Sequence, residues 1–285
     1  KTLMIAAESA LYSAKADGRG TWRFFEPELQ TQQAERRQLE ADLRLALAQG
    51  QFELAYQPQV NTTAGTVTGV EALLRWRHPR RGLVSPAAFI PLAEETGLIV
   101  PIGRWVLAQA CADAAGWPAG VRLAVNVSAV QFQQGGLLSD VLSALQASGL
   151  PPGRLEVEIT ETAMLRDPQH ALATLGELRA NGVRVAMDDF GTGYSSLSTL
   201  RSFPFDRIKI DRSFVRDAET RADTRAIVRA VAGLGRSLGM STTVEGVETA
   251  SQLEIVRNEG CEEVQGFLFS RPQPAAAIPA LIEQL

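Results

Sequence analysis

The stretch FELAYQPQVNTTAGTVTGVEALLRW (52–76) sets the topology of the chain, because it holds two strand-like runs joined by a very short connection. The runs cover residues 52–60 and 67–76, and only NTTAGT (61–66) lies between them. Two parallel strands need a crossover of about a dozen residues or more. The first two strands are therefore expected to be antiparallel.

A regular alternation of strands and helices follows this hairpin. Further strand-like runs cover 121–128, 154–160, 183–189, 206–211, 241–246 and 263–269, and helical patterns cover 86–97, 101–115, 137–148, 168–181, 194–202, 222–238, 249–259 and 275–284. Such alternation is typical of parallel strands joined by helical crossovers. Eight strands in about 235 residues approach the size of a (β/α)8 barrel, about 250 residues. We therefore expect an α/β fold, a modified (β/α)8 TIM-like barrel with an antiparallel first strand.

The N-terminal part of the chain has a different pattern. A helical pattern at 6–16 and a strand-like run at 21–25 are too short to fold alone. Leucines recurring every four residues predict a helix over 31–49, ended by Gly50. No long low-complexity segment interrupts residues 50–285, so we expect them to form one domain, in a chain that is part of a longer protein.

Histidine and cysteine are scarce, with two of each among 285 residues. Cys111 and Cys261 lie far apart, as do His78 and His170, whereas zinc sites need clusters at short spacing. A zinc finger, a histidine-rich metallohydrolase, an iron–sulfur protein and a disulfide scaffold are therefore not expected. With 32 acidic residues, any metal here should be a hard cation held by oxygen, such as Mg²⁺ or Mn²⁺.

The charge and hydropathy of the chain narrow its partners. A net charge of −4 argues against binding a nucleic-acid polymer. No run of 18 apolar residues occurs, so no direct membrane insertion is expected. Two distant cysteines suit a reducing compartment, which predicts a cytoplasmic location, although the parent protein could carry a membrane anchor.

Acidic and amide side chains recur near the ends of successive strands. They are Glu71, Asn126, Glu158, Asp188, Asp189, Glu245 and Gln265. In barrels of this type, functional groups gather at the C-terminal face, so these residues should converge. Buried carboxylates repel one another unless cations neutralise them, which predicts a divalent metal site.

The adjacent carboxylates Asp188 and Asp189 place a condition on the backbone. In a regular strand they would point to opposite faces, so both reach one site only if the strand ends there and the chain turns. Gly191 and Gly193 follow at once and permit such a turn. A carboxylate pair at this point could bridge two metals roughly 3.5–4 Å apart.

Two basic residues complete the candidate site. Lys209 could orient an attacking water, or it could simply neutralise Asp188 or Glu158, and both interpretations remain open. Arg75 shares a strand face with Glu71 and is the best candidate for binding a ligand phosphate.

Eight motifs occur in an order that resembles one known family. They are YQP (56–58), EALLRW (71–76), NVS (126–128), EITE (158–161), DDFGTGYSSL (188–197), KID (209–211), EGVET (245–249) and QGFLFSRP (265–272). Together they resemble the EAL-domain cyclic di-GMP phosphodiesterases over about residues 30–285. The resemblance implies hydrolysis of cyclic di-GMP to linear pGpG with two Mg²⁺ or Mn²⁺ ions, and the same barrel with an antiparallel first strand.

The resemblance also assigns roles to single residues. One metal would be bound by Glu71, Asn126, Glu158 and Asp188, and the second by Asp188, Asp189 and Glu245. Lys209 would position the attacking water, so that Lys209, Glu71, Asp188 and Asp189 form the catalytic set. Gln57, Arg75, Asp211 and Gln265 would contact the substrate, and Glu161 and Glu248 would stabilise the DDFGTGYSSL loop.

The resemblance extends to the partners of the domain. ALYSAKADGRG (10–20) is similar to the last helix of a GGDEF diguanylate cyclase domain, although the GGDEF motif itself is absent. The resemblance therefore implies that residues 1–29 are the remnant of a preceding GGDEF domain with its linker, and that residues 30–285 are the phosphodiesterase barrel. The parent protein is expected to join GGDEF and sensor domains to this barrel, in a homodimer coupled to the DDFGTGYSSL loop.

Two alternative functions remain open. The domain could be a cyclic di-GMP receptor without catalysis, although a receptor does not need a water-orienting Lys209. It could also be an enolase-like Mg²⁺ lyase that uses Lys209 as its base, which would leave the Asp188–Asp189 pair unexplained. Turnover by the isolated domain excludes the first, and a panel of ligands tests the second.

Overall fold

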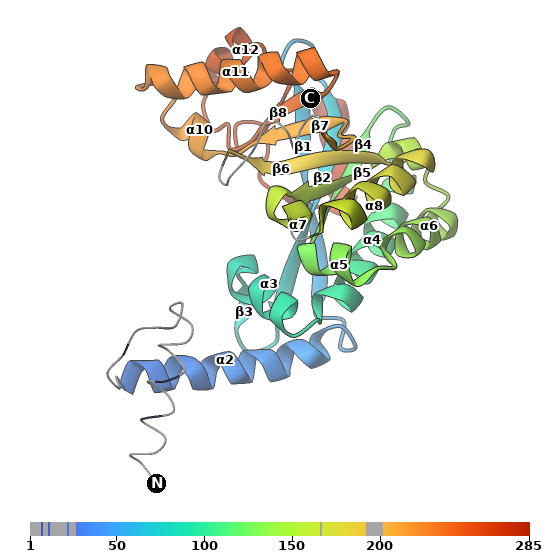
Figure 1. The fold of residues 1–285 in the computed structure, drawn as a ribbon, viewed down its shortest axis with the longest axis vertical. Coiled ribbons are helices and arrows are strands. Elements are labelled where there is room, and N and C mark those ends of the chain that lie inside the picture. The colour runs from blue at the N-terminus through green and yellow to red at the C-terminus, as the bar shows by residue number, and fades with distance from the viewer. Residues whose placement is uncertain (1–6, 8–10, 12–21, 23–26, 166, 192–201) are drawn as a thin grey trace. The chain divides into compact units, whose positions relative to one another are not determined.

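A computed structural model describes residues 7, 11, 22, 27–165, 167–191 and 202–285 of the chain (Figure 1). The strand expected at 21–25, most of the helix expected at 6–16 and nearly all of the helix expected at 194–202 lie outside the described residues. The same is true of residues 192–197 in the DDFGTGYSSL motif.

Eight strands close into a barrel. They are β1 (Phe52–Asn61), β2 (Val67–His78), β4 (Arg122–Val127), β5 (Leu155–Thr160), β6 (Arg184–Phe190), β7 (Arg207–Ile210), β8 (Ser241–Val244) and β9 (Glu263–Gln265). Their order is β1-β9-β8-β7-β6-β5-β4-β2, and a pairing between β1 and β2 closes the ring. The pairs from β2 through β9 are parallel, whereas β1 runs antiparallel to β9. The predicted barrel with an antiparallel first strand is confirmed.

Two short strands were not predicted, and several predicted strands are shorter than expected, most of all the last. β3 (Gly82–Val84) pairs antiparallel with β2, and β10 (Gln273–Pro274) pairs antiparallel with β1. The run expected at 263–269 ends as a strand at Gln265, because the chain turns against Val247. A Cβ on Gly266 would lie 1.9 Å from the Val247 carbonyl oxygen, so only glycine fits this close approach.

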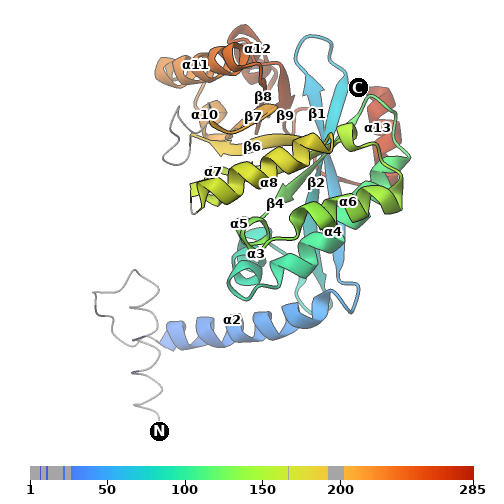
Figure 2. The same ribbon diagram turned by 45° about the vertical axis from the view of Figure 1, so that its right-hand side comes forward.

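The helices follow the predicted ranges closely. They are α2 (Pro27–Ala46), α3 (Pro86–Glu95), α4 (Ile99–Ala115), α5 (Ala129–Gln134), α6 (Leu137–Ser148), α7 (Glu161–Leu165), α8 (Pro168–Ala180), α10 (Ser213–Arg216), α11 (Ala222–Leu238), α12 (Ala250–Asn258) and α13 (Ile278–Gln284). The short helices α5, α7 and α10 were not predicted, and α2 begins and ends earlier than the range 31–49. Figures 1 and 2 show α4, α6 and α8 along one flank of the sheet and α11 beside β7 and β8.

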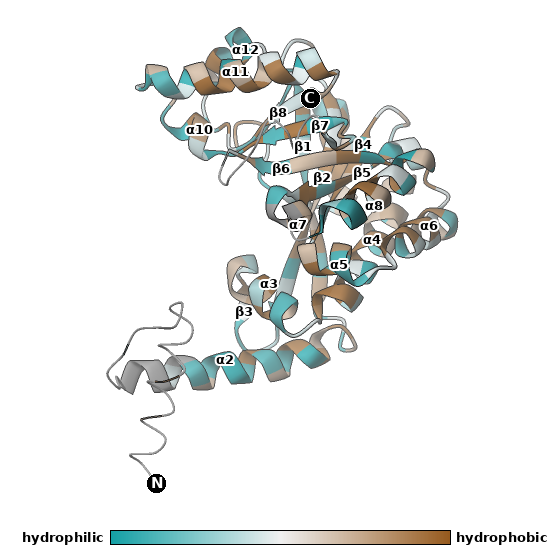
Figure 3. Ribbon diagram, in the orientation of Figure 1, coloured by the Kyte–Doolittle hydropathy of each residue, from teal (hydrophilic) through white to brown (hydrophobic). Residues whose placement is uncertain are grey.

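The apolar core lies between the strands and these helices. On β5, Leu155, Val157 and Ile159 are fully buried on one strand face, while Glu156 and Glu158 occupy the other. Figure 3 shows that apolar and polar residues also alternate along the helices, with apolar segments on α4 and mixed hydropathy on α11. The second face of the strands therefore lines the inside of the barrel, and it is polar.

The chain divides into two compact units, residues 1–52 with 76–96 and residues 53–75 with 97–285. In the first unit, α2 packs with α3, and the rings of Phe52, Trp76 and Phe89 lie with centroids 5.6–6.1 Å apart. The buried His78 lies 3.1 Å from a carboxylate oxygen of Asp42. The second unit contains the candidate site. Within the described residues, no helix combines the length and apolar character needed to cross a bilayer.

Candidate functional site

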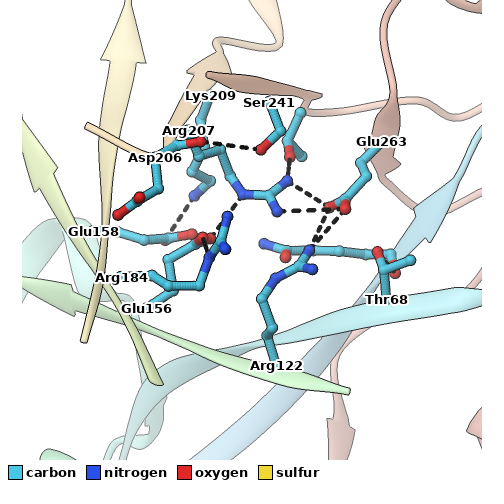
Figure 4. A network of polar contacts seen from close by, with 12 residues as sticks. Thr68, Arg122, Glu156, Glu158, Arg184, Asp206, Arg207, Lys209, Ser241 and Glu263 are labelled. Carbon is cyan, nitrogen blue, oxygen red and sulfur yellow. Dashed lines mark hydrogen bonds and ion pairs between the residues drawn. The ribbon is translucent and has the colours of Figure 1, made fainter. Parts of the chain in front are cut away.

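The barrel interior carries two layers of polar side chains, because residues two apart on a strand share one face. The upper layer consists of Gln57, Glu71, Asn126, Glu158, Asp188, Lys209, Glu245 and Gln265, and the lower layer of Gln59, Arg122, Glu156, Arg207, Thr243 and Glu263. Figure 4 shows Glu156 and Glu158 from one strand directed toward Arg207 and Lys209 from another. The upper layer contains the residues that the strand ends predicted.

Lys209 is the charged centre of the upper layer. Its Nζ lies 2.7 Å from Glu158 Oε2, 2.7 Å from Glu245 Oε1, 3.2 Å from Asp188 Oδ1 and 3.8 Å from Glu71 Oε1. Burial alone lowers the pKa of Lys209, but the four carboxylates outweigh it and raise the pKa well above its usual value. The side chain is therefore a fixed cation in this structure, and it does neutralise Asp188 and Glu158.

One oxygen of Glu158 is left without a partner. Glu158 is 1% exposed, and its Oε2 accepts a hydrogen bond from Lys209. Its Oε1 is buried and has no hydrogen-bond partner among the described residues. Burial raises the pKa of Glu158 well above its usual value, although Lys209 opposes the shift. A buried carboxylate oxygen of this kind is costly unless a cation binds it.

Asp188 and Asp189 reach the same site through an irregularity in β6. The strand does not end at Asp189, as the sequence suggested, but continues to Phe190 with a register shift between Met187 and Phe190. Asp189 has φ of 55°, and no other non-glycine residue among those described has a positive φ. This left-handed conformation turns its side chain toward that of its neighbour. A β-bulge therefore provides the change of backbone direction that both carboxylates need to reach one site.

The two aspartates and Glu245 form a group that could bind a metal. One carboxylate oxygen from each of Asp188, Asp189 and Glu245 lies within 4.8 Å of the others. Burial and the charge of Asp188 raise the pKa of Asp189, and burial raises the pKa of Glu245 to about 7. Crowded carboxylates hold protons at higher pH because their charges repel, and a divalent cation relieves this repulsion.

Amide side chains fix the orientation of Glu71. Asn126 Nδ2 donates to Glu71 Oε1 at 2.6 Å, and Gln265 Nε2 donates to Glu71 Oε2 at 2.5 Å. Gln59 Nε2 in turn donates to Gln265 Oε1 at 3.2 Å, so the amide of Gln265 is oriented from the lower layer. Gln265 also donates to Gln57 Oε1 at 3.1 Å.

The donors of the upper layer suit a hard divalent cation. They are carboxylate and amide oxygens, which Mg²⁺ and Mn²⁺ prefer, and they include the unpartnered oxygen of Glu158. The residues that could hold the ions are those that the sequence proposed, namely Glu71, Asn126, Glu158, Asp188, Asp189 and Glu245.

A pocket of about 380 Å³ opens above the upper layer. Its lining residues are Gln57, Glu71, Leu73, Asp188, Asp189, Asp211, Arg212, Glu245, Gly246, Glu248, Gln265, Gly266 and Phe267. The expected substrate contacts Gln57, Asp211 and Gln265 are among them. Arg75 is not; it is half-buried, and its Nη1 donates to the neighbouring carbonyl of Leu74 at 3.0 Å.

The two residues expected to stabilise the DDFGTGYSSL loop lie in different surroundings. Glu161 is 5% exposed and begins α7. Glu248 is exposed and lines the pocket. Because residues 192–201 lie outside the described chain, their contacts with that loop stay a prediction.

Sequence reasoning missed the lower layer and three pocket residues. Arg207 is 1% exposed, its Nε lies 2.8 Å from Glu156 Oε1, and it also binds Glu263. Arg122 Nη2 donates to Glu263 Oε1 at 2.7 Å. Arg207 and Lys209 are two residues apart on β7 and so share a strand face, which means that the period of two could have identified Arg207. Leu73 and Phe267 lie within the EALLRW and QGFLFSRP motifs, and Arg212 directly follows KID, but no pattern in the sequence marked these three as pocket residues.

Comparisons with known proteins agree with this geometry. Residues 40–272 match the EAL domain family. The bifunctional diguanylate cyclase/cyclic di-GMP phosphodiesterase MucR of Pseudomonas aeruginosa is 46% identical over 284 residues, which cover 98% of this chain and 42% of MucR. The cyclic di-GMP phosphodiesterase NbdA of the same organism is 42% identical over 97% of this chain and 36% of its own length.

A solved structure is similar as well. The PaMucR phosphodiesterase in complex with c-di-GMP has a TM-score of 0.81 and 47% identity, over 85% of this chain and 99% of that one. The chain spans about a third to two-fifths of the length of the curated relatives that it matches.

Proposed function

The chain belongs to the EAL domain family, and on this premise we propose that it hydrolyses cyclic di-GMP to linear pGpG with two Mg²⁺ or Mn²⁺ ions. The observation that carries the proposal is the convergence of Asp188, Asp189 and Glu245 within 4.8 Å, beside the buried Lys209. Relatives with this activity in their names cover nearly the whole chain. The proposed activity lowers the level of a bacterial second messenger.

The charge of the pocket supports the proposed dependence of the reaction on metal ions. Six of its lining residues are carboxylates, and the substrate carries a negative charge on each of its two phosphodiesters. Two divalent ions held by the upper layer would offset this repulsion, generate the nucleophile and polarise the phosphoryl group. Substrate binding should therefore depend on metal as strongly as turnover does.

The side chains of the chain itself orient the reactants. Glu158, Glu245 and Asp188 hold Lys209 Nζ in place beside the carboxylate cluster, where it is proposed to orient the attacking water once metal ions engage these carboxylates. Glu71 is fixed by the amides of Asn126 and Gln265. Gln57 and Asp211 line the pocket above and are proposed to contact the nucleotide.

Incubation of the protein with cyclic di-GMP and Mg²⁺, followed by chromatography of the nucleotides, tests the proposal. We expect pGpG in the presence of Mg²⁺ or Mn²⁺ and none in EDTA. If cyclic di-GMP binds in the presence of metal and remains intact, the receptor alternative is correct and the catalytic proposal fails. The enolase-like alternative is disfavoured by the family and by the paired aspartates.

The parent protein is proposed to be a tandem GGDEF–EAL protein with an upstream sensor. Residues 1–29 are proposed to belong to the preceding domain and its linker, and residues 30–285 to the phosphodiesterase. The bifunctional relative MucR supports this arrangement, since the chain covers 42% of it. A homodimer and a cytoplasmic location of the domain remain part of the proposal, and light scattering of the purified domain tests the former.

A further inference from the structure

Arg212 is a cation placed among carboxylates at the candidate site. It lines the pocket above the upper layer together with six acidic residues, and the described lining includes no other lysine, arginine or histidine. The side chain is exposed, and no hydrogen bond or ion pair joins it to the rest of the described chain. An arginine that is free and surrounded by acidic residues is available to an anionic ligand.

The backbone places Arg212 beside one of the proposed metal ligands. Gly246, which directly follows Glu245, has φ of 71°, and a Cβ built on it would lie 2.4 Å from the Cβ of Arg212. The absence of a side chain at Gly246 therefore lets the base of Arg212 pack against the chain next to Glu245. Arg212 also follows Asp211, another pocket residue, at the start of α10.

A second pocket of about 550 Å³ extends the site past Arg212. It is lined by Asp211, Arg212, Ser213, Arg216, Gly246, Glu248 and Gln252, and it shares four of these residues with the first pocket. Arg212 thus lies where the two pockets meet. Arg212 therefore borders both the pocket that contains the carboxylate cluster and the second pocket beside it.

We propose that Arg212 binds the phosphodiester of cyclic di-GMP that is not cleaved, and so positions the other phosphodiester over the carboxylate cluster. This inference rests on the proposed function. The guanidinium offers paired N–H donors that match two phosphate oxygens. Arg75, whose Nη1 donates to the carbonyl of Leu74, does not line the pocket in this structure, and its expected contact with the substrate stays a separate prediction.

Two substrates separate this role from a general effect on the metal site. Cyclic di-GMP has two phosphodiesters, whereas bis(4-nitrophenyl) phosphate has one and no guanine. For Arg212→Ala we expect KM for cyclic di-GMP to rise about 10- to 100-fold with kcat within about threefold of wild type, the pattern of a lost binding contact. Hydrolysis of bis(4-nitrophenyl) phosphate with Mn²⁺ should not change.

Two further variants complete the experiment. Arg221→Ala is the matched control, because Arg221 is exposed, pairs with Asp223 and lines neither pocket, and it should leave both reactions unchanged. Arg212→Lys should keep part of the affinity, since a point charge still attracts phosphate. A lysine variant that binds cyclic di-GMP as tightly as wild type would show that the paired N–H donors are not used, and would overturn the bidentate phosphate contact.

The outcomes distinguish this inference from the proposed function. If the wild-type protein forms no pGpG, the function fails. If it does and Arg212→Ala has an unchanged KM, or loses both substrates equally, only the assignment of Arg212 is wrong.

Discussion

Lys209 Nζ lies 2.7 Å from Glu158 Oε2, and both residues are 1% exposed. The pair lies at the centre of a group of carboxylates. When no metal ion is bound, the positive charge of Lys209 offsets the negative charges of this group. Removal of either partner leaves buried charge without compensation, which is costly in proteins. The stability of the protein and its metal binding should therefore be linked through Lys209.

Lys209→Met should destabilise the metal-free protein by about 3–5 kcal/mol, because its carboxylate neighbours would lose their counter-charge. Mg²⁺ should restore more stability to this variant than it adds to wild type. Urea unfolding in EDTA and in Mg²⁺ measures both effects. Arg104→Ala, which breaks an exposed pair with Asp140, is the control and should cost less than about 1 kcal/mol. Equal stability of Lys209→Met and wild type in EDTA would contradict the prediction.

Glu71→Gln should reduce the formation of pGpG by at least about 100-fold, since it removes a negative charge from the proposed metal site. The amide oxygen can still accept the hydrogen bond from Asn126 or Gln265, so the fold should be retained. Initial rates measure the expected loss of turnover, and circular dichroism tests whether the fold is retained. Turnover close to that of wild type would remove Glu71 from the metal site.

The charge of Asp189 and its left-handed backbone conformation can be tested separately by two substitutions. Asp189→Asn keeps a residue that tolerates the left-handed conformation, so stability should hold while Mn²⁺ binding weakens. Asp189→Val should also destabilise the fold, by about 1–3 kcal/mol, because a β-branched residue is strained at φ of 55°. Calorimetry with Mn²⁺ and thermal unfolding provide the two measurements. If both variants unfold alike, the strain argument is wrong.

Arg207→Met should cost about 3–5 kcal/mol, because it leaves Glu156 and Glu263 buried with less compensating charge. Arg184→Met is the matched control, since Arg184 also contacts Glu156 but its side chain is 35% exposed. Chemical unfolding of the two variants should give a clearly smaller loss for Arg184→Met. Similar losses would mean that burial does not determine the strength of this network.

The pH dependence of the metal-free protein should follow Glu245. Burial, with the charges of Asp188 and Glu71, raises its pKa from 4.5 to about 7, although Lys209 opposes the shift. The folded state then binds a proton that the unfolded state has lost, so stability should fall as pH rises from about 4.5 to about 7. Unfolding midpoints in EDTA measure this slope, and Glu245→Gln should flatten it. A stability that rises through this range would exclude the assignment.

The sequence predicted the barrel and the upper layer well because both depend on short-range patterns. The six-residue connection between the first two strands required an antiparallel pair, and polar residues at strand ends located Glu71, Glu158 and Asp188. These inferences need only the period of two and the rule that functional groups gather at strand ends.

Other features depend on tertiary geometry that no local pattern specifies. The bulge at Asp189 is set by register with β7, and the end of β9 by the packing of Gly266 on Val247. The direction of a long side chain is equally nonlocal, so sequence alone could not tell that Arg75 would turn toward its own backbone while Arg212 entered the pocket. The lower layer was predictable in principle, had the alternation been followed one step further down each strand.

The lower layer also sets the order in which the chain can fold during synthesis. Arg122 and its partner Glu263 are 141 residues apart, and Arg207 needs the same glutamate. A ribosome that has made the first seven barrel strands has therefore made arginines whose shared counter-ion does not yet exist. Closure of the barrel must wait until the eighth barrel strand, β9, emerges, so until then the nascent domain depends on its helices, or on a chaperone, to keep its sheet from pairing with other chains.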